Sequence, residues 1–86
     1  MVENSVIVTN PTGLHARPAK HICSQAQKFK SKIEIVLADK VIDAKSILNI
    51  MACAIGSGAQ LTIRCHGEDE TLALDTMVAI IADLND

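Results

Sequence analysis

The 86-residue sequence predicts an α+β sandwich, in which helices cover one side of a sheet. Short stretches of alternating apolar and polar residues predict four strands, and stretches with apolar residues at spacings of three and four predict three helices. These elements follow one another as βαββαβα, and four short strands with alternating faces suit a sheet covered on one side only. The length fits a single domain over residues 1–86, and the pattern alone leaves the strand order open.

The first half of the chain supplies two strands and a helix. Val2–Thr9 is rich in valine and isoleucine and predicts the first strand, which a turn at Asn10–Gly13 ends. Ala16–Lys28 predicts a helix, with Pro18 in its first turn, where a missing N–H has little effect. Lys32–Leu37 predicts the second strand. The apolar positions of the helix are Ala16, Ala19, Ile22, Cys23, Ala26 and Phe29.

The second half supplies two strands and two helices. Val41–Asp43 predicts the third strand, and a short helix follows over about Ser46–Ile55, stopped by Gly56–Gly58. Gln60–His66 predicts the fourth strand by its alternation. The acidic run Glu68–Glu70 begins the third helix, where the helix dipole favours negative charge. The apolar stripe of that helix is Leu74, Met77, Val78, Ile81 and Leu84.

Composition argues against several classes of function. The net charge is −2 and Phe29 is the only aromatic residue, so nothing favours a nucleic-acid partner. The sequence has neither an apolar run long enough to span a bilayer nor a secretory signal, which predicts a cytoplasmic protein without membrane insertion. The three cysteines, Cys23, Cys53 and Cys65, are widely spaced in apolar patterns. We therefore expect buried reduced thiols and no metal site.

The stretch Gly13-Leu14-His15-Ala16-Arg17-Pro18-Ala19 is the most informative part of the sequence. It places His15 at the cap of the first helix, where the backbone N–H groups of Ala16 and Arg17 would meet an anion on the ring. The Arg17 guanidinium adds a charged fork suited to phosphate oxygens. Neutral imidazole is a nucleophile, and it leaves readily once phosphorylated, so no cofactor is needed. A lone histidine here would be an ordinary surface residue, but its neighbours favour a phosphoryl acceptor.

This stretch resembles the active-site signature of the HPr family, the phosphocarriers of the bacterial phosphoenolpyruvate-dependent sugar phosphotransferase system. The segment Lys45-Ser46-Ile47-Leu48, followed by Ile50-Met51, is similar to the regulatory-serine segment of that family, and the resemblance covers essentially the whole chain. It implies an open-faced sandwich of four antiparallel strands and three helices. It also implies that enzyme I phosphorylates His15 on Nδ1, that Arg17 stabilises the phosphate, and that enzyme IIA domains of sugar permeases receive the group. Such a protein is a stoichiometric carrier and not an enzyme, and we expect a monomer.

Ser46 has two expected roles. As the first residue of the second helix it is a natural N-cap. The resemblance adds phosphorylation of Ser46 by HPr kinase/phosphorylase and binding to a catabolite-control transcription regulator. The helix that follows is apolar nearly all round, so we expect part of it to be an exposed docking patch. Ile47, Leu48 and Met51 are expected to face outward, and Ile50 and Ala54 inward.

Some residues depart from the family pattern. Lys20 stands where a small residue is usual, His21 where an apolar or neutral one is, and Asn49 where glycine is frequent. By helical spacing, Arg17, Lys20 or His21, and Ser24 share one exposed face, so we expect Lys20, His21 and Ser24 to contact partners. His66 is predicted to be an ordinary surface residue on a solvated strand face.

Two other functions stay open. One is a regulatory protein of the same fold that acts only through Ser46 and binds a transcription regulator. The presence of both His15 and Arg17 disfavours it, because a purely regulatory form would not need them. The other is a carrier in the nitrogen-related branch of the phosphotransferase system.

Overall fold

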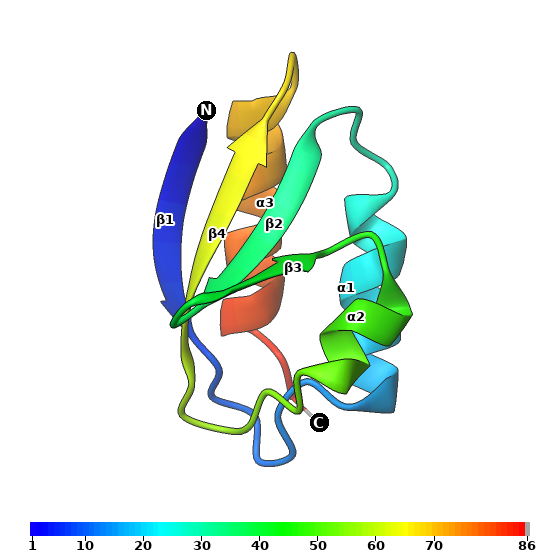
Figure 1. Ribbon diagram of the computed structural model, residues 1–86, viewed down its shortest axis with the longest axis vertical. Coiled ribbons are helices and arrows are strands. Elements are labelled where there is room, and N and C mark those ends of the chain that lie inside the picture. The colour runs from blue at the N-terminus through cyan, green and yellow to red at the C-terminus, as the bar shows by residue number, and fades with distance from the viewer. Residues whose placement is uncertain (86) are drawn as a thin grey trace.

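The computed structural model describes residues 1–85 and has the predicted order βαββαβα. The elements are β1 (Val2–Ile7), α1 (Ala16–Ala26), β2 (Lys32–Leu37), β3 (Lys40–Asp43), α2 (Ile47–Ala52), β4 (Gln60–His66) and α3 (Glu70–Ala82). The strands form one antiparallel sheet in the order β1-β4-β2-β3, and the three helices lie on the same face of it (Figure 1). The predicted fold class is therefore confirmed. Within residues 1–85, no helix is long and apolar enough to cross a membrane.

The core lies between the sheet and the helices. Alternation along β4 turns Leu61, Ile63 and Cys65 inward, as predicted, and the antiparallel register sets Ile63 beside Ile35 of β2. The apolar positions of the helices face this layer, which fixes the rotation of α1 and α3 against the sheet. The fully buried helix residues are Pro18, Ala19, Ile22 and Ala26 of α1, Ile50 of α2, and Ala73, Met77 and Ile81 of α3.

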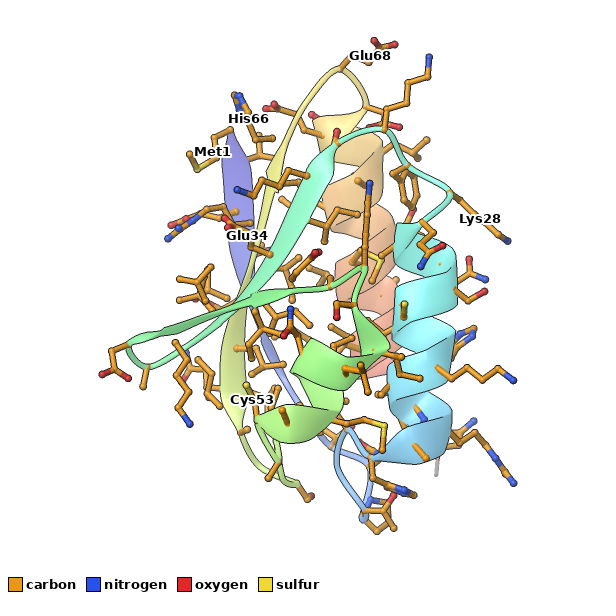
Figure 2. The ribbon with its side chains drawn as sticks, turned by 45° about the vertical axis from the view of Figure 1, so that its right-hand side comes forward. Met1, Lys28, Glu34, Cys53, His66 and Glu68 are labelled. Carbon is orange, nitrogen blue, oxygen red and sulfur yellow. The ribbon has the colours of Figure 1, made fainter. Side chains whose placement is uncertain are left out.

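The opposite face of the sheet is open and charged. Arg64 of β4 lies 3.2 Å from Glu3 of β1 and 4.0 Å from Glu34 of β2, and Figure 2 shows Glu34 on the side away from the helices. His66 is exposed, as predicted. Solvent-accessible ion pairs of this kind each contribute little to the free energy of unfolding, so the main effect of these charges is to make this face of the sheet hydrophilic.

Two elements in the first half of the chain end earlier than their patterns predict. α1 ends at Ala26 and not at Lys28, because the Gln27 and Lys28 N–H groups close a tight last turn onto Cys23 and Gln25 carbonyls. β1 ends at Ile7 and not at Thr9, because Val8 leaves the ladder. Its N–H donates to the Ala59 carbonyl at 2.9 Å, and its carbonyl accepts from the Gly58 N–H at 2.7 Å. Ala16, the first position of the predicted apolar stripe, is exposed.

The expected inward position of Ala54 is wrong. α2 ends at Ala52 rather than near Ile55, and Ala54 takes the left-handed conformation with φ +49°. The chain reverses there, which leaves Ala54 exposed and buries the next residue, Ile55. The apolar pattern of the sequence predicts a helix that continues through Ala54, so it gives no sign of this turn. The same turn leaves Cys53 partly exposed beside the end of α2 (Figure 2), so only Cys23 and Cys65 fit the predicted buried thiols.

Ala54→Gly should stabilise the protein by about 1 kcal/mol, because glycine adopts positive φ without the Cβ penalty that alanine has. The free energy of unfolding in urea measures this. Ala79→Gly is the matched control, since Ala79 is also exposed but lies inside the helix α3. There the same substitution should destabilise by roughly 0.5–1 kcal/mol. Destabilisation by both would contradict the left-handed turn at Ala54.

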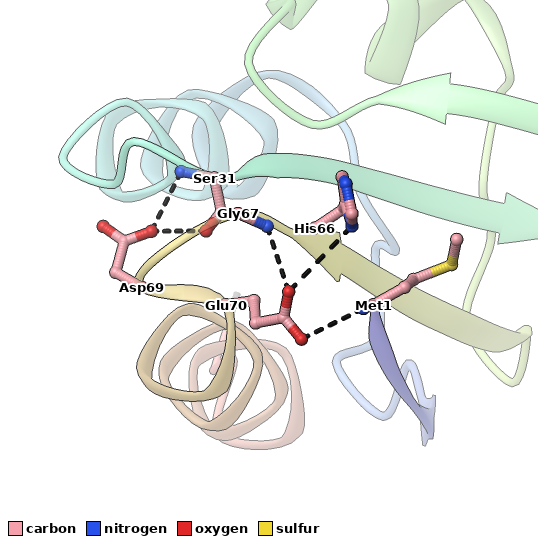
Figure 3. A network of polar contacts seen from close by, with 6 residues as sticks. All are labelled: Met1, Ser31, His66, Gly67, Asp69 and Glu70. Atoms are coloured by element: carbon pink, nitrogen blue, oxygen red, sulfur yellow. Dashed lines mark hydrogen bonds and ion pairs between the residues drawn. The ribbon is translucent and has the colours of Figure 1, made fainter.

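Acidic residues tie the start of α3 to neighbouring segments (Figure 3). The Asp69 carboxylate accepts the Lys30 and Ser31 N–H groups, each at 2.9 Å, and the Ser31 hydroxyl. Glu70 accepts the Gly67 N–H at 3.1 Å and pairs with the amino group of Met1 at 3.1 Å. Asp69 thus stands at the N-cap position, but its side chain binds the segment before β2 and makes no cap hydrogen bond.

Stability should fall in acid through Asp69. The hydrogen bond from the Ser31 hydroxyl, followed by the Lys30 N–H, lowers the pKa of Asp69 from 3.8 to about 2. A pKa lower in the folded state means that this contribution is present above about pH 4 and is lost as the pH falls towards 2. Urea unfolding of wild type and Asp69→Asn between pH 2 and 6 should therefore show a weaker pH dependence in the variant. Asp75→Asn, on the exposed side of α3, serves as the control. Equal pH dependence of wild type and Asp69→Asn would contradict this assignment.

Candidate functional site

His15 occupies the predicted cap position at the start of α1. Its backbone is extended (φ −87°, ψ −157°), and its carbonyl accepts the Ala19 N–H at 2.8 Å. The imidazole makes no cap hydrogen bond and is exposed. Ala16 and Arg17 are the first two residues of the helix, so their N–H groups have no carbonyl partner within it, and Pro18, in the same turn, has no N–H. His15 thus lies at a helix N-terminus, where backbone donors and the helix dipole favour an anion.

The segment before His15 packs against the loop after α2 and is hydrogen-bonded to it. Leu14 is 1% exposed, and its N–H donates to the Ile55 carbonyl at 2.9 Å. Gly13 has φ +70°, and a Cβ on it would lie 2.4 Å from the Ile55 oxygen and 2.8 Å from the Gly56 Cα. Only glycine allows this close approach. Sequence reasoning gave Ile55 and Gly56 no role at the site, because only the folded chain brings these two loops together.

His15 stands between two open hollows at one end of the molecule. The start of α1, the loop after α2 and the C-terminal part of the chain gather there (Figure 1). One hollow is lined by Pro11, Thr12, Ala16, Arg17 and Asn85, and the other by Thr12, Leu14, Met51, Ala54, Ile55 and Gly56. His15 lines both. Open hollows on either side of an exposed ring suit the surface of a protein partner better than an enclosed small molecule.

The expected outward positions of the α2 residues are partly confirmed. Leu48 is 77% exposed and Met51 is 43% exposed, as predicted, whereas Ile47 is only partly accessible. Ile47 lines a groove between α1 and α2 together with Lys20 and Ser24. These two α1 residues therefore lie on the same side as the apolar surface of α2.

His21 lies apart from this groove. It lines a hollow with Ile80, Asp83 and other residues at the end of α3. A helix turns about 100° per residue, so Lys20 and His21 face different neighbours. The predicted docking set thus divides into an α2 side, with Lys20 and Ser24, and an α3 side, with His21.

The net charge of −2 conceals an uneven distribution of charged residues along the chain. Between Glu3 and Glu34 the sequence has no acidic residue, but it has four lysines and Arg17. Lys20 and Arg17 both lie on the exposed side of α1. Lys30 and Lys32 form ion pairs with Glu68 and Glu34, beyond the end of α1, whereas Arg17 and Lys20 place positive charge on the exposed side of α1, close in sequence to His15. A count of charge by segment would have found this signal.

The comparisons with known proteins agree with this geometry. The model of a family described as PTS HPr component phosphorylation site matches residues 2–83. The chain belongs to the HPr family. It is 40% identical to the phosphocarrier protein HPr of Mycoplasma capricolum over 83 residues, which are 96% of this chain and 93% of the relative. It is 43% identical to the HPr-like protein Crh of Halalkalibacterium halodurans over 81 residues, 94% and 96% of the two chains.

Solved HPr structures share the fold. A crystal structure of HPr from Thermoanaerobacter tengcongensis has a TM-score of 0.90 and 37% identity, covering 94% of this chain and 91% of the other. Another structure from that organism is of an HPr dimer, with a TM-score of 0.74, 37% identity and coverage of 94% and 93%. Family and fold confirm the resemblance in the sequence and associate the chain with the phosphocarriers of the phosphotransferase system.

In this HPr-family chain, Ser46 is the N-cap of α2, as its position in the sequence predicts. Its hydroxyl accepts the Asn49 N–H at 3.3 Å, and its carbonyl accepts the Ile50 N–H at 3.1 Å. Leu48, the most exposed residue of the apolar patch, is two positions further along. A change of charge at Ser46 would therefore act at the edge of the patch.

Proposed function

We propose that this HPr-family chain is a stoichiometric phosphocarrier of the cytoplasm. It accepts a phosphoryl group on His15 from enzyme I and passes it to enzyme IIA domains of sugar permeases, and it works as a monomer. The observation that carries the proposal is the exposed His15 ring at the N-cap of α1, with Arg17 in the same turn.

The transfer needs little chemistry from the carrier itself. The Nδ1 lone pair of His15 attacks the phosphorus held by enzyme I, the Nδ1–P bond forms, and the bond from phosphorus to enzyme I breaks. In the neutral ring the other nitrogen keeps its proton. The N–H groups of Ala16 and Arg17 and the Arg17 guanidinium stabilise the negative oxygens. A nucleophile on the enzyme IIA domain then attacks the same phosphorus, and the Nδ1–P bond breaks. The carrier is phosphorylated by one partner and dephosphorylated by the next, so it acts as a substrate of both and returns to its starting form.

The surface around His15 suits partners with an apolar centre and acidic groups near it. Leu48 and Met51 supply apolar contact area, and Ile47, Lys20 and Ser24 extend it along the α1–α2 groove. The basic side of α1 would steer an acidic surface towards the site. His21 contributes only to partners that also reach the end of α3.

Incubation with enzyme I, phosphoenolpyruvate and magnesium tests the proposal directly. Mass spectrometry should show the gain of a single phosphate that is labile to acid. The gain should require both enzyme I and phosphoenolpyruvate. A chain that stays unmodified beside a functional HPr control would contradict the proposed function.

Phosphorylation of Ser46 by HPr kinase/phosphorylase is proposed to inhibit this transfer. A phosphate there adds about −2 charge at the start of α2, next to Leu48, where an apolar partner surface must cover it. Ser46→Asp should therefore accept phosphoryl from enzyme I more slowly than Ser46→Ala, by about tenfold if 1.4 kcal/mol of docking energy is lost. Phosphorylation rates, measured beside melting curves, check this. Equal rates for the two folded variants would leave Ser46 as a helix cap only.

The second candidate is a regulatory protein that acts through Ser46 and binds a catabolite-control transcription regulator. The similarity to the HPr-like protein Crh favours it. The enzyme I assay distinguishes the two functions, because a purely regulatory protein is not expected to gain acid-labile phosphate on His15. A carrier of the nitrogen-related branch would accept phosphoryl but donate it to other enzyme IIA domains.

A further inference from the structure

Asn10 is a buried polar residue in the turn that leads to His15. Among the residues described, it and Ser31 are the buried residues with polar side chains, and Asn10 is 1% exposed. Its Nδ2 group donates to the Gly13 carbonyl at 2.8 Å, and the Gly13 N–H donates to the Asn10 carbonyl at 3.3 Å. A buried amide donor placed on one particular carbonyl restrains that carbonyl strongly, because breaking the bond strands both groups away from water.

The restrained carbonyl belongs to a peptide group that is held at both ends. The peptide unit between Gly13 and Leu14 has its oxygen on Asn10 Nδ2 and its N–H on the Ile55 carbonyl, at 2.9 Å. A peptide unit is planar, so these two bonds fix its rotation about the chain. Leu14, which follows, is anchored in the core. His15 is the next residue, and its own side chain makes no cap hydrogen bond that would hold it.

We propose that Asn10 is a positioning residue for phosphoryl transfer, whose amide holds the Gly13–Leu14 peptide and through it the His15 ring at the start of α1. This inference rests on the proposed function, because it requires His15 to be the acceptor. In-line attack depends on the placement of the attacking nitrogen, so a small shift slows transfer even in a folded protein. A merely structural role would lower the melting temperature and leave transfer by the folded protein unchanged.

Asn10→Asp tests the role of the donor with almost no change of shape. The ionised carboxylate only accepts hydrogen bonds and would face the Gly13 oxygen, whereas the protonated acid can donate to it. Transfer relative to wild type should fall by about tenfold at pH 8 and recover as the pH is lowered towards 5.5. Taking the ratio to wild type at each pH removes the pH dependence of enzyme I. Asn4→Asp, at an exposed position on β1, is the matched control and should keep the wild-type rate.

Amide hydrogen exchange gives a second readout that does not depend on transfer. The Leu14 N–H should exchange faster in Asn10→Asp than in Asn4→Asp at neutral pH. If Asn10→Asp fails to fold, Asn10→Ala removes the donor without adding charge and should also transfer slowly at temperatures where it is folded.

Several results would overturn the proposal. These are a wild-type rate in the folded variant at every pH, a loss that does not recover in acid, or unchanged exchange at Leu14. A wild-type chain that enzyme I does not phosphorylate would instead remove the proposed function. The exchange measurement would still decide in that case whether Asn10 restrains the peptide.

Discussion

His15→Ala should abolish the acid-labile phosphate while leaving the fold intact. The His15 side chain is exposed and makes no cap hydrogen bond, so its removal should change the free energy of unfolding by less than about 0.5 kcal/mol. Neither of the other histidines has equivalent surroundings. His21 lies in the second turn of α1 on the α3 side, and His66 lies 4.0 Å from Glu70, by the start of α3. Neither adjoins the start of α1, where backbone donors face an anion.

The measurement is phosphoenolpyruvate-dependent labelling by enzyme I, read by mass and by acid lability. His21→Ala and His66→Ala are the matched controls, and both should still be labelled. Acid-labile phosphate on the His15→Ala variant would show that another residue is the acceptor. Melting curves of the three variants should overlap with that of wild type, which separates loss of the acceptor from loss of structure.

Gly13→Ala should destabilise the protein by about 3 kcal/mol, the combined effect of a left-handed alanine and an overpacked contact. The added Cβ would lie 2.4 Å from the Ile55 oxygen, so the two loops must move apart. That movement weakens the Leu14–Ile55 hydrogen bond and displaces His15, so transfer should fall together with stability.

Gly58→Ala separates the two effects. Gly58 also has positive φ, at +88°, but a Cβ there would meet nothing within 4 Å. It should therefore show only the conformational penalty of about 1–2 kcal/mol. The free energy of unfolding in urea measures both variants. Equal losses at the two glycines would show that the close approach to Ile55 is absent in solution.

Local patterns predicted most of the fold because alternation and helical spacing are local properties. The inward set of β4 was predicted residue by residue, and so was the cap position of His15. The end of α2 was not, because the left-handed turn falls on Ala54, and alanine is a typical helix residue. A glycine there would have signalled the end of the helix.

The parts of the site that depend on tertiary neighbours could not be predicted. Spacing grouped Lys20 with His21 as alternatives on one face, but only the packing of α2 and α3 against α1 assigns each to its side. The reason for glycine at position 13 is likewise a contact with Ile55, 42 residues further along the chain. The proposal that His15 is the phosphoryl acceptor is decided by the labelling of the His15→Ala variant.

The hydrogen bonds between the His15 loop and the loop after α2 also bear on the order of folding. Val8 bonds to Gly58 and Ala59, and Leu14 bonds to Ile55, so every one of these contacts joins segments more than 40 residues apart. Loop closure over that distance has a large entropic penalty, and contacts of this kind form slowly. We therefore expect the helical turn at α1 to form early, while the support behind His15 is among the last features to appear. A chain emerging from the ribosome would expose His15 well before residues 55–59 arrive to hold it in place.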